Sequence, residues 1–151
     1  MWPIFAEVVA AGDTYVFSPS SNRDDALAYW FGPGVASWVA EVDGRIAGMY
    51  KLIPNQRDLG SHVANASFMV SPAMQCAGVG RAMAVHALGQ AKAIGFLAMQ
   101  FNFVVSTNEA ALALWKSLGF SVVGTLPRAF KHQGLGYVDA HVMYRALDDI
   151  G

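Results

Sequence analysis

The segment Ala66–Ala82, ASFMVSPAMQCAGVGRA, organises the chain because it joins an expected strand to an expected helix through a glycine-rich turn. Residues 66–70 are small or apolar and suit a strand, which Pro72 ends. From Val79 to Ile94 the apolar residues recur at helical spacing, and Gly95 suits the end of that helix. The segment therefore predicts a strand, a short turn and a long helix in direct succession.

The turn carries the pattern Gln75-x-x-Gly78-x-Gly80. Glycines at the N-terminus of a helix allow several backbone N–H groups to point at one anion, and the helix dipole favours negative charge there. One interpretation is a phosphate cradle. The other is a tight strand-to-helix turn that uses glycine only for its backbone freedom. The pattern alone favours these two interpretations equally.

The residues next to the glycines indicate which kind of phosphate-containing ligand the turn could bind. A Walker loop requires lysine and a hydroxyl residue after its last glycine, but Gly80 is followed by Arg81 and Ala82. A dinucleotide loop requires a third glycine where Met83 stands, and an acidic residue where Gln100 stands. The remaining common ligand is a pyrophosphate bound without metal, such as that of coenzyme A.

Two motifs resemble those of the GNAT N-acetyltransferase superfamily. Gln75-x-x-Gly78-x-Gly80 resembles its acetyl-CoA motif, which has Gln or Arg, then Gly, then Gly or Ala at this spacing. Asn108-x-x-Ala111-x-x-Leu114-Trp115-x-x-x-Gly119-Phe120 resembles a second GNAT pattern, in which the asparagine contacts the cofactor and the helix packs beside its pantetheine and thiol end. The two motifs stand in the family's order.

The resemblance implies that acetyl-CoA is the cosubstrate and that no metal is needed. Backbone N–H groups near residues 68–70 would bond the thioester carbonyl, and those near residues 78–81 would hold the pyrophosphate. Asn108 also suits a plain helix N-cap, and the two roles are compatible. The implied cofactor-binding residues are Phe68, Met69, Val70, Gln75, Gly78, Val79, Gly80, Arg81, Ala82, Asn108, Ala111 and Trp115.

One branch of the family resembles the chain more closely, namely the proline-analogue N-acetyltransferases known from fungal azetidine-2-carboxylate acetyltransferase. The resemblance rests on Ser61-His62-x-x-Asn65-Ala66-x-Phe68-x-Val70 and Phe101-Asn102-x-Val104-x-x-Thr107-Asn108. Asparagines at these positions are associated there with substrate binding and catalysis, which implies catalytic roles for Asn65 and Asn102. Asn102 is also unexpected on an apolar strand, and a buried amide without a partner costs about 1–3 kcal/mol.

The chain departs from the family at two positions. Trp115 stands where many members have a tyrosine that protonates the departing thiolate, and an indole has no usable acidity. Either another group serves, or the thiolate leaves largely unassisted; Tyr137 and Tyr144 are candidates by type, although sheet packing is favoured for both. The central strand also lacks the family's glutamate base. His62 is a candidate base by its side-chain type, but a position in a loop or at a sheet end is favoured.

The order of expected elements is typical of the GNAT fold, an α/β acyl-CoA N-acyltransferase fold with a mixed central sheet flanked by about four helices. A single domain over residues 1–151 is expected. Ser21 is expected to cap the second helix. Residues 54–61 are expected to form a mobile loop, and Leu126–Gly136 is expected to form an ordered loop. Helices are expected over 3–11, 22–31, 79–94 and from the cap Asn108 to 118, and strands over 35–42, 45–53, 66–70, 96–105, 120–125 and 137–147.

The composition of the chain argues against several classes of protein. The chain is 54% hydrophobic and 14% charged with a net charge of -1, which favours one sizeable core and gives no electrostatic case for nucleic acid or an anionic membrane. One cysteine excludes a disulfide framework, and the four histidines lack ligand spacing. The short Trp2–Ala11 run suits neither a signal peptide nor a membrane span. We expect a cytoplasmic protein, monomeric or homodimeric.

The resemblance therefore predicts an acetyl-CoA-dependent N-acetyltransferase in which the amine of a small molecule, such as an amino acid or proline analogue, attacks the thioester directly. Cys76 is then expected to be structural. Two alternatives remain open. A protein or peptide N-acetyltransferase is disfavoured because no acidic patch for a basic tail is visible. A non-catalytic acyl-CoA-binding module is favoured by the missing tyrosine and glutamate.

Overall fold

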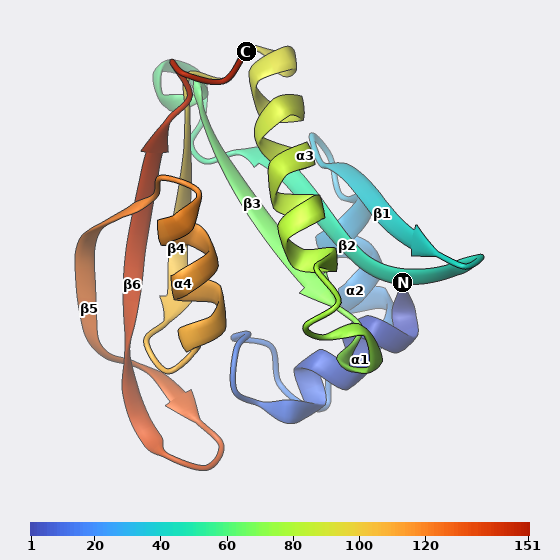
Figure 1. Cartoon of the computed structure of the whole chain (residues 1–151). Coiled ribbons are helices and arrows are strands. Elements are labelled where there is room, and N and C mark those ends of the chain that lie inside the picture. Colours follow the sequence, from blue (N-terminus) through green and yellow to red (C-terminus); the bar gives the residue numbers. More distant parts are fainter.

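The computed structural model describes residues 1–151 and arranges helices on a six-stranded sheet (Figure 1). The helices are α1 Trp2–Ala11, α2 Arg23–Phe31, α3 Val79–Ile94 and α4 Glu109–Ser117, with 3-10 turns η1 Asp58–Gly60 and η2 Pro72–Met74. The strands are β1 Ala36–Val42, β2 Arg45–Pro54, β3 Val63–Val70, β4 Ala98–Val105, β5 Ser121–His132 and β6 Gly136–Ala146.

The sheet has the order β1-β2-β3-β4-β6-β5. Strands β3 and β4 are parallel, and every other neighbouring pair is antiparallel. Parallel strands need a long crossover, which α3 provides between β3 and β4. The expected mixed sheet with about four flanking helices is confirmed.

The parallel strands β3 and β4 separate soon after they meet. Their pairing is confined to Val63–Asn65 on β3 and Ala98–Gln100 on β4. Beyond these residues the strands diverge and leave an opening between residues 66–70 and 101–105, which we call the wedge. The register of β4 against β6 also shifts between Phe101 and Val104, and such irregularities bend a strand away from its neighbour.

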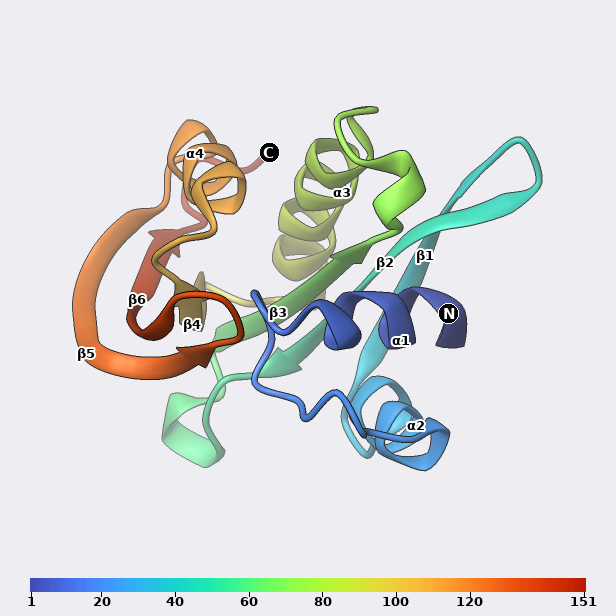
Figure 2. The ribbon, with the colours of Figure 1, turned by 90° about the horizontal axis from the view of Figure 1, so that it is seen from below.

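Helices cover both faces of the sheet, with α3 and α4 on one face and α1 and α2 on the other (Figure 2). The larger core lies beneath α3 and α4, where α3 buries Val79, Met83, Ala84, Ala87, Leu88 and Ala91. The smaller core lies beneath α1 and α2 and contains Phe5, Trp30, Met49 and Met69. None of the helices has both the length and the apolar character that a bilayer crossing requires.

Several local features follow from single residues. Asp43 and Gly44 both adopt positive φ (50° and 73°), which is the two-residue hairpin turn expected between β1 and β2. The cap of α2 was expected at Ser21 but lies at Asn22. The Asn22 side chain accepts from the backbone N–H groups of Asp24 and Asp25, and the Asp25 carboxylate accepts from the Asn22 N–H, which completes a capping box.

The prediction of a loop over Leu126–Gly136 is wrong. Strand β5 continues to His132, and only residues 133–135 remain between β5 and β6. Pro127 is tolerated because β5 is an edge strand, where a missing N–H leaves no neighbour unpaired. The pairing of β5 with β6 is irregular around Pro127: its register shifts between Leu126 and Phe130, and Arg128 adopts the left-handed conformation at φ 53°.

Candidate active site

The turn between β3 and α3 leaves several backbone N–H groups without partners. Gly78 precedes the helix in the left-handed conformation (φ 79°) and has no side chain to cap it. The first helical residue bonded within the helix is Ala82, whose N–H donates to the Gly78 carbonyl (3.0 Å). The N–H groups of Val79, Gly80 and Arg81 therefore remain free at the positive end of the helix dipole. We call residues 75–81 the cradle.

The surroundings of the cradle fit a pyrophosphate. A Cβ added at Gly80 would lie 3.6 Å from Val70 Cγ2 and 3.8 Å from Leu114 Cδ2, in ordinary van der Waals contact, so a side chain larger than alanine would press on these neighbours. The Arg81 guanidinium donates to Ser117 Oγ (3.0 Å), which holds a positive charge beside the cradle. Free amides and a nearby cation form a donor set that suits phosphate groups.

Two predicted cofactor contacts are not brought to the cradle or the wedge. The N–H of Ala82 is used within the helix. Met69 is 2% exposed in the core beneath α1, and its backbone faces β2, because Ser71 N–H on the same strand edge donates to the Ala47 carbonyl (2.8 Å). Gln75 is exposed at the start of the cradle.

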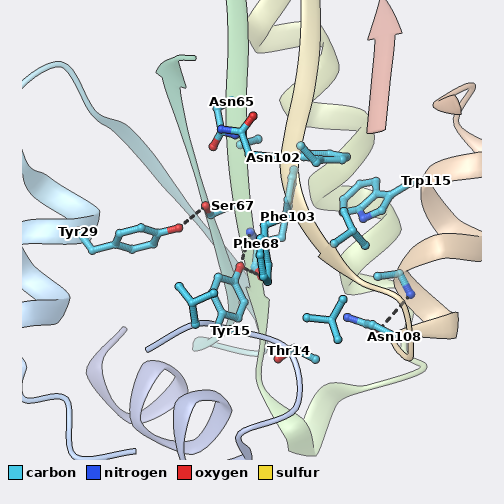
Figure 3. A pocket seen from close by; sticks show the side chains of 16 residues that line it. Thr14, Tyr15, Tyr29, Asn65, Ser67, Phe68, Asn102, Phe103, Asn108 and Trp115 are labelled. Atoms are coloured by element: carbon cyan, nitrogen blue, oxygen red, sulfur yellow. Dashed lines mark hydrogen bonds between the residues drawn. The ribbon is translucent and has the colours of Figure 1, made fainter. Parts of the chain in front are cut away.

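A cavity of about 240 Å³ opens at the wedge (Figure 3). It brings together six of the predicted residues, namely Asn65, Phe68, Asn102, Asn108, Ala111 and Trp115. The N-terminal part of the chain closes it with Thr14, Tyr15, Val16 and Tyr29. None of the lining side chains carries a charge, so the polar groups of the cavity are hydroxyls and amides.

The two asparagines proposed as catalytic differ in their surroundings. Asn65 Nδ2 donates to the Gln100 carbonyl (3.1 Å), and its Oδ1 has no partner. Asn102 is exposed, donates to Asn55 Oδ1 (2.7 Å) and accepts from Gln100 Nε2 (2.9 Å). The argument that Asn102 is a buried amide without a partner is therefore wrong, because the irregular end of β4 places it among polar neighbours.

Helix α4 supplies one wall of the cavity. Asn108 caps it, since Asn108 Oδ1 accepts from the Ala111 N–H (3.2 Å), as expected for a plain N-cap. Trp115 is 7% exposed, and its ring centroid lies 4.9 Å from that of Phe68 and 4.5 Å from that of Phe101. Trp115 therefore acts by packing between the strands and the helix.

Two tyrosines that sequence reasoning did not single out reach the cavity. The Tyr15 hydroxyl donates to the Phe68 carbonyl (2.6 Å) and accepts from the Phe68 N–H (3.0 Å). The Tyr29 hydroxyl shares a hydrogen bond with Ser67 Oγ. The Phe68 N–H predicted for the thioester is thus occupied by Tyr15, and the Val70 N–H, two residues along the same edge, faces the wedge. Tyr15 lies in a turn-rich segment without periodicity, so no pattern marked it.

The other candidate acids and bases lie elsewhere. His62 is exposed at the start of β3, at the end away from the cradle. Tyr137 is exposed on β6, with the Arg128 guanidinium 5.5 Å from its ring centroid, and Tyr144 is half-buried on β6. None of the three lines the cavity, in agreement with their expected structural roles.

The buried side chain of Lys51 contacts both the backbone and the ring of Tyr29. Lys51 is 5% exposed, its Nζ donates to the Tyr29 carbonyl (2.8 Å), and it lies 3.1 Å from the centroid of the Tyr29 ring. It thereby caps the C-terminal end of α2, which has no basic residue in its last turn. No carboxylate pairs with Lys51, and burial lowers the pKa of its ammonium from 10.5 to about 8.

Stability is expected to rise with pH because of Lys51. Between pH 8 and 10 the folded protein holds Lys51 neutral while the unfolded chain still binds the proton, so the free energy of unfolding increases by at most about 1.4 kcal/mol per pH unit. From pH 10 the tyrosines oppose this, because burial raises the pKa of Tyr15 and Tyr29 and the unfolded chain ionises first. Urea titrations across this range measure the slope.

Lys51→Met should remove the slope, because the variant has no proton to release at this position. Lys131→Met, at an exposed position on β5, is the matched control and should keep the wild-type slope. Equal slopes in both variants would show that burial of Lys51 does not control the pH dependence.

The free amides of the cradle and the uncharged cavity at the wedge fit an acyltransferase that takes its acyl group from a coenzyme A thioester. The chain belongs to the acetyltransferase (GNAT) family, whose model matches residues 4–120. It is an N-acetyltransferase that uses acetyl-CoA. No three His, Cys, Asp or Glu side chains gather as a metal-binding group.

Known proteins agree with this assignment. N-acetyltransferase aca1 from Schizosaccharomyces pombe is 29% identical over an alignment of 151 positions that covers 89% of this chain and 72% of that protein. A GCN5-related N-acetyltransferase from Kribbella flavida is 44% identical with a TM-score of 0.90, over 97% of this chain and 89% of that one. A putative acetyltransferase from Salmonella typhimurium with its cofactor acetyl-CoA has the same fold at 24% identity, with a TM-score of 0.85 over 99% and 87% of the two chains.

Proposed function

We propose that the acceptor is the amine of a small molecule, such as an amino acid or a proline analogue. The observation that supports this most directly is the cavity at the wedge, because about 240 Å³ suits a small acceptor and is below the usual size of a site for drug-sized ligands. The resemblance of residues 61–70 and 101–108 to the proline-analogue branch points the same way.

The uncharged lining supports binding of the neutral amine. No acidic side chain lines the cavity, so an ammonium would enter it without a counter-charge, whereas the hydroxyl and amide donors of the lining can hydrogen-bond the carboxylate of an amino acid. Asn65 Oδ1 is the free acceptor that can take an N–H of the amine and orient its lone pair. Asn102 can contact the same acceptor from β4. Turnover should therefore rise with pH as the amine loses its proton.

The proposed cofactor contacts follow from the free amides. The N–H groups of Gly78, Val79, Gly80 and Arg81 would hold the pyrophosphate, with Gln75 at its edge. Val70 and Phe68 would face the acyl end, and Asn108, Ala111 and Trp115 would line the thiol end. When bound, acetyl-CoA supplies an acetyl group activated as a thioester. The residues of the chain then position the amine and keep water from reacting with the acetyl group in its place.

The experiment is a panel of acceptors assayed by thiol release from acetyl-CoA. The panel contains cyclic and acyclic amino acids, simple amines without a carboxylate, and peptides with free N-termini. We expect the highest kcat/KM for a small cyclic or branched amino acid. Peptides as the best acceptors would overturn the proposal, and acetyl-CoA binding by calorimetry without turnover of any acceptor would do so too.

A further inference from the structure

Tyr15 bridges two parts of the chain that are far apart in sequence. It lies in the segment between α1 and α2, and its hydroxyl bonds both the N–H and the carbonyl of Phe68 in the middle of β3 (Figure 3). The Tyr15 side chain is partly buried and lines the cavity. The tyrosine therefore delivers one hydroxyl to the place where the central strand faces the acceptor.

The position of this hydroxyl is set by the divergence of the strands. The edge of β3 at Phe68 would ordinarily pair with β4, but the pairing ends at Asn65 and Gln100. The backbone groups of Phe68 would then lack partners, and the Tyr15 hydroxyl supplies both an acceptor and a donor. The hydroxyl therefore occupies the acceptor position at the Phe68 N–H, which is the position that a thioester oxygen would take.

We infer that Tyr15 is a catalytic residue: in the loaded enzyme its O–H group donates to the acetyl carbonyl oxygen beside the Phe68 N–H. This inference rests on the proposed placement of the acyl end in the wedge. For the carbonyl oxygen to accept from the Phe68 N–H it displaces the Tyr15 oxygen, which accepts there at 3.0 Å, and the displaced hydroxyl turns its proton from the Phe68 carbonyl (2.6 Å) to that oxygen. Two donors would then converge on one oxygen, which is the arrangement of an oxyanion hole.

The step that Tyr15 assists is acyl transfer. The amine nitrogen forms a bond to the acetyl carbon, the carbon–sulfur bond breaks, and its electron pair leaves with sulfur. The proton that the nitrogen loses ends on sulfur to give the CoA thiol. Negative charge builds on the carbonyl oxygen as the nitrogen attacks, and the Tyr15 O–H stabilises it while keeping its own proton.

The surroundings of Tyr15 suit a donor that is not consumed. Burial raises the pKa of Tyr15 well above its usual value, with a further increase from neighbouring Tyr29, so the hydroxyl stays protonated over the range in which amines react. The other phenol of the cavity, Tyr29, is bonded to Ser67, and Trp115 is packed between Phe68 and Phe101. Tyr15 is the hydroxyl that contacts the Phe68 amide.

The test is Tyr15→Phe, which removes the hydroxyl and keeps the ring. We expect kcat to fall about 10- to 100-fold, the scale of one oxyanion donor. Calorimetry provides a readout besides activity: affinity for acetyl-CoA relative to free CoA should fall in the variant, because only acetyl-CoA carries the carbonyl. Tyr137→Phe, which removes an exposed phenol outside the cavity, should change neither quantity.

Two outcomes would overturn the inference. An unchanged kcat with tighter acetyl-CoA binding would show that Tyr15 only obstructs the wedge. An unchanged kcat with unchanged binding would show a purely structural bond. Should Tyr15→Phe fail to fold, fluorotyrosine at position 15 retains the ring and the hydroxyl; kcat that follows the acidity of the phenol supports the inference, and kcat indifferent to it refutes the inference.

The assay uses whichever acceptor of the panel reacts best, including a peptide. A failure of the proposed small-molecule acceptor would therefore appear in the wild-type panel, whereas a failure of the Tyr15 role would appear only in the ratio of variant to wild type.

Discussion

Gly80→Val is expected to weaken acetyl-CoA binding by about 100-fold, which corresponds to the loss of one or two charge-assisted hydrogen bonds. The Gly80 N–H is one of the free donors of the cradle, and a Cβ at this position would already touch Val70 Cγ2 and Leu114 Cδ2 at 3.6 and 3.8 Å. The further methyl groups of valine have to displace these side chains or the phosphate. Calorimetric titration with acetyl-CoA measures the effect.

The matched control is Gly89→Ala in the same helix, where an added Cβ meets nothing within 4 Å. It should leave affinity unchanged and stabilise α3 by about 1 kcal/mol, the difference in helix propensity. Gly80→Ala should lie close to wild type because its Cβ makes ordinary contacts. Normal binding by Gly80→Val, or loss of wild-type binding on addition of EDTA, would contradict a metal-free pyrophosphate site in the cradle.

Asn65→Ala is expected to lower kcat/KM for the best amine by about 10- to 1000-fold, the scale of losing one or two hydrogen bonds in a site. Asn65 Nδ2 is fixed on the Gln100 carbonyl, which holds the side chain at the last paired residue before the wedge opens. Its Oδ1 is then the acceptor left for the substrate. Steady-state kinetics with the amine and with acetyl-CoA varied in turn measure the loss.

Acetyl-CoA affinity should change little in Asn65→Ala, because the cradle lies at the other end of β3. Asn102→Ala serves as the comparison and should cost less, since Asn102 is exposed and already held by Asn55 and Gln100. A loss of acetyl-CoA binding and of folding stability in step with turnover would assign Asn65 a structural role.

The strand-to-helix turn before α3 and the helices could be predicted because their signals are local. Glycine at positions 78 and 80, the helical stripe of α3 and the Asp43-Gly44 turn each reflect backbone preferences of a few neighbouring residues. The cap of α2 could also have been found, because Asp25 three positions after Asn22 forms a capping box.

The features that could not be predicted depend on contacts between segments that are distant in the sequence. Strand β5 runs through Pro127 only because it lies at the edge of the sheet, and strand order is not written in the local sequence. Tyr15 becomes part of the site because β3 and β4 diverge at Phe68, 53 residues further along the chain. The exposure of Asn102 likewise follows from the irregular register of β4 rather than from its apolar neighbours.

The wedge also leaves few backbone pairs at the centre of the sheet. The half containing β1, β2 and β3 is paired with the half containing β4, β5 and β6 through three residue pairs at one end, and beyond them the Phe68 ring bridges the wedge by packing on Phe101 and Trp115. Acetyl-CoA bound there would contact both halves, and a ligand that binds only the folded state raises the free energy of unfolding by about 2.7 kcal/mol at a hundred times its Kd. The cosubstrate would then provide part of the connection that backbone hydrogen bonds provide elsewhere in the sheet.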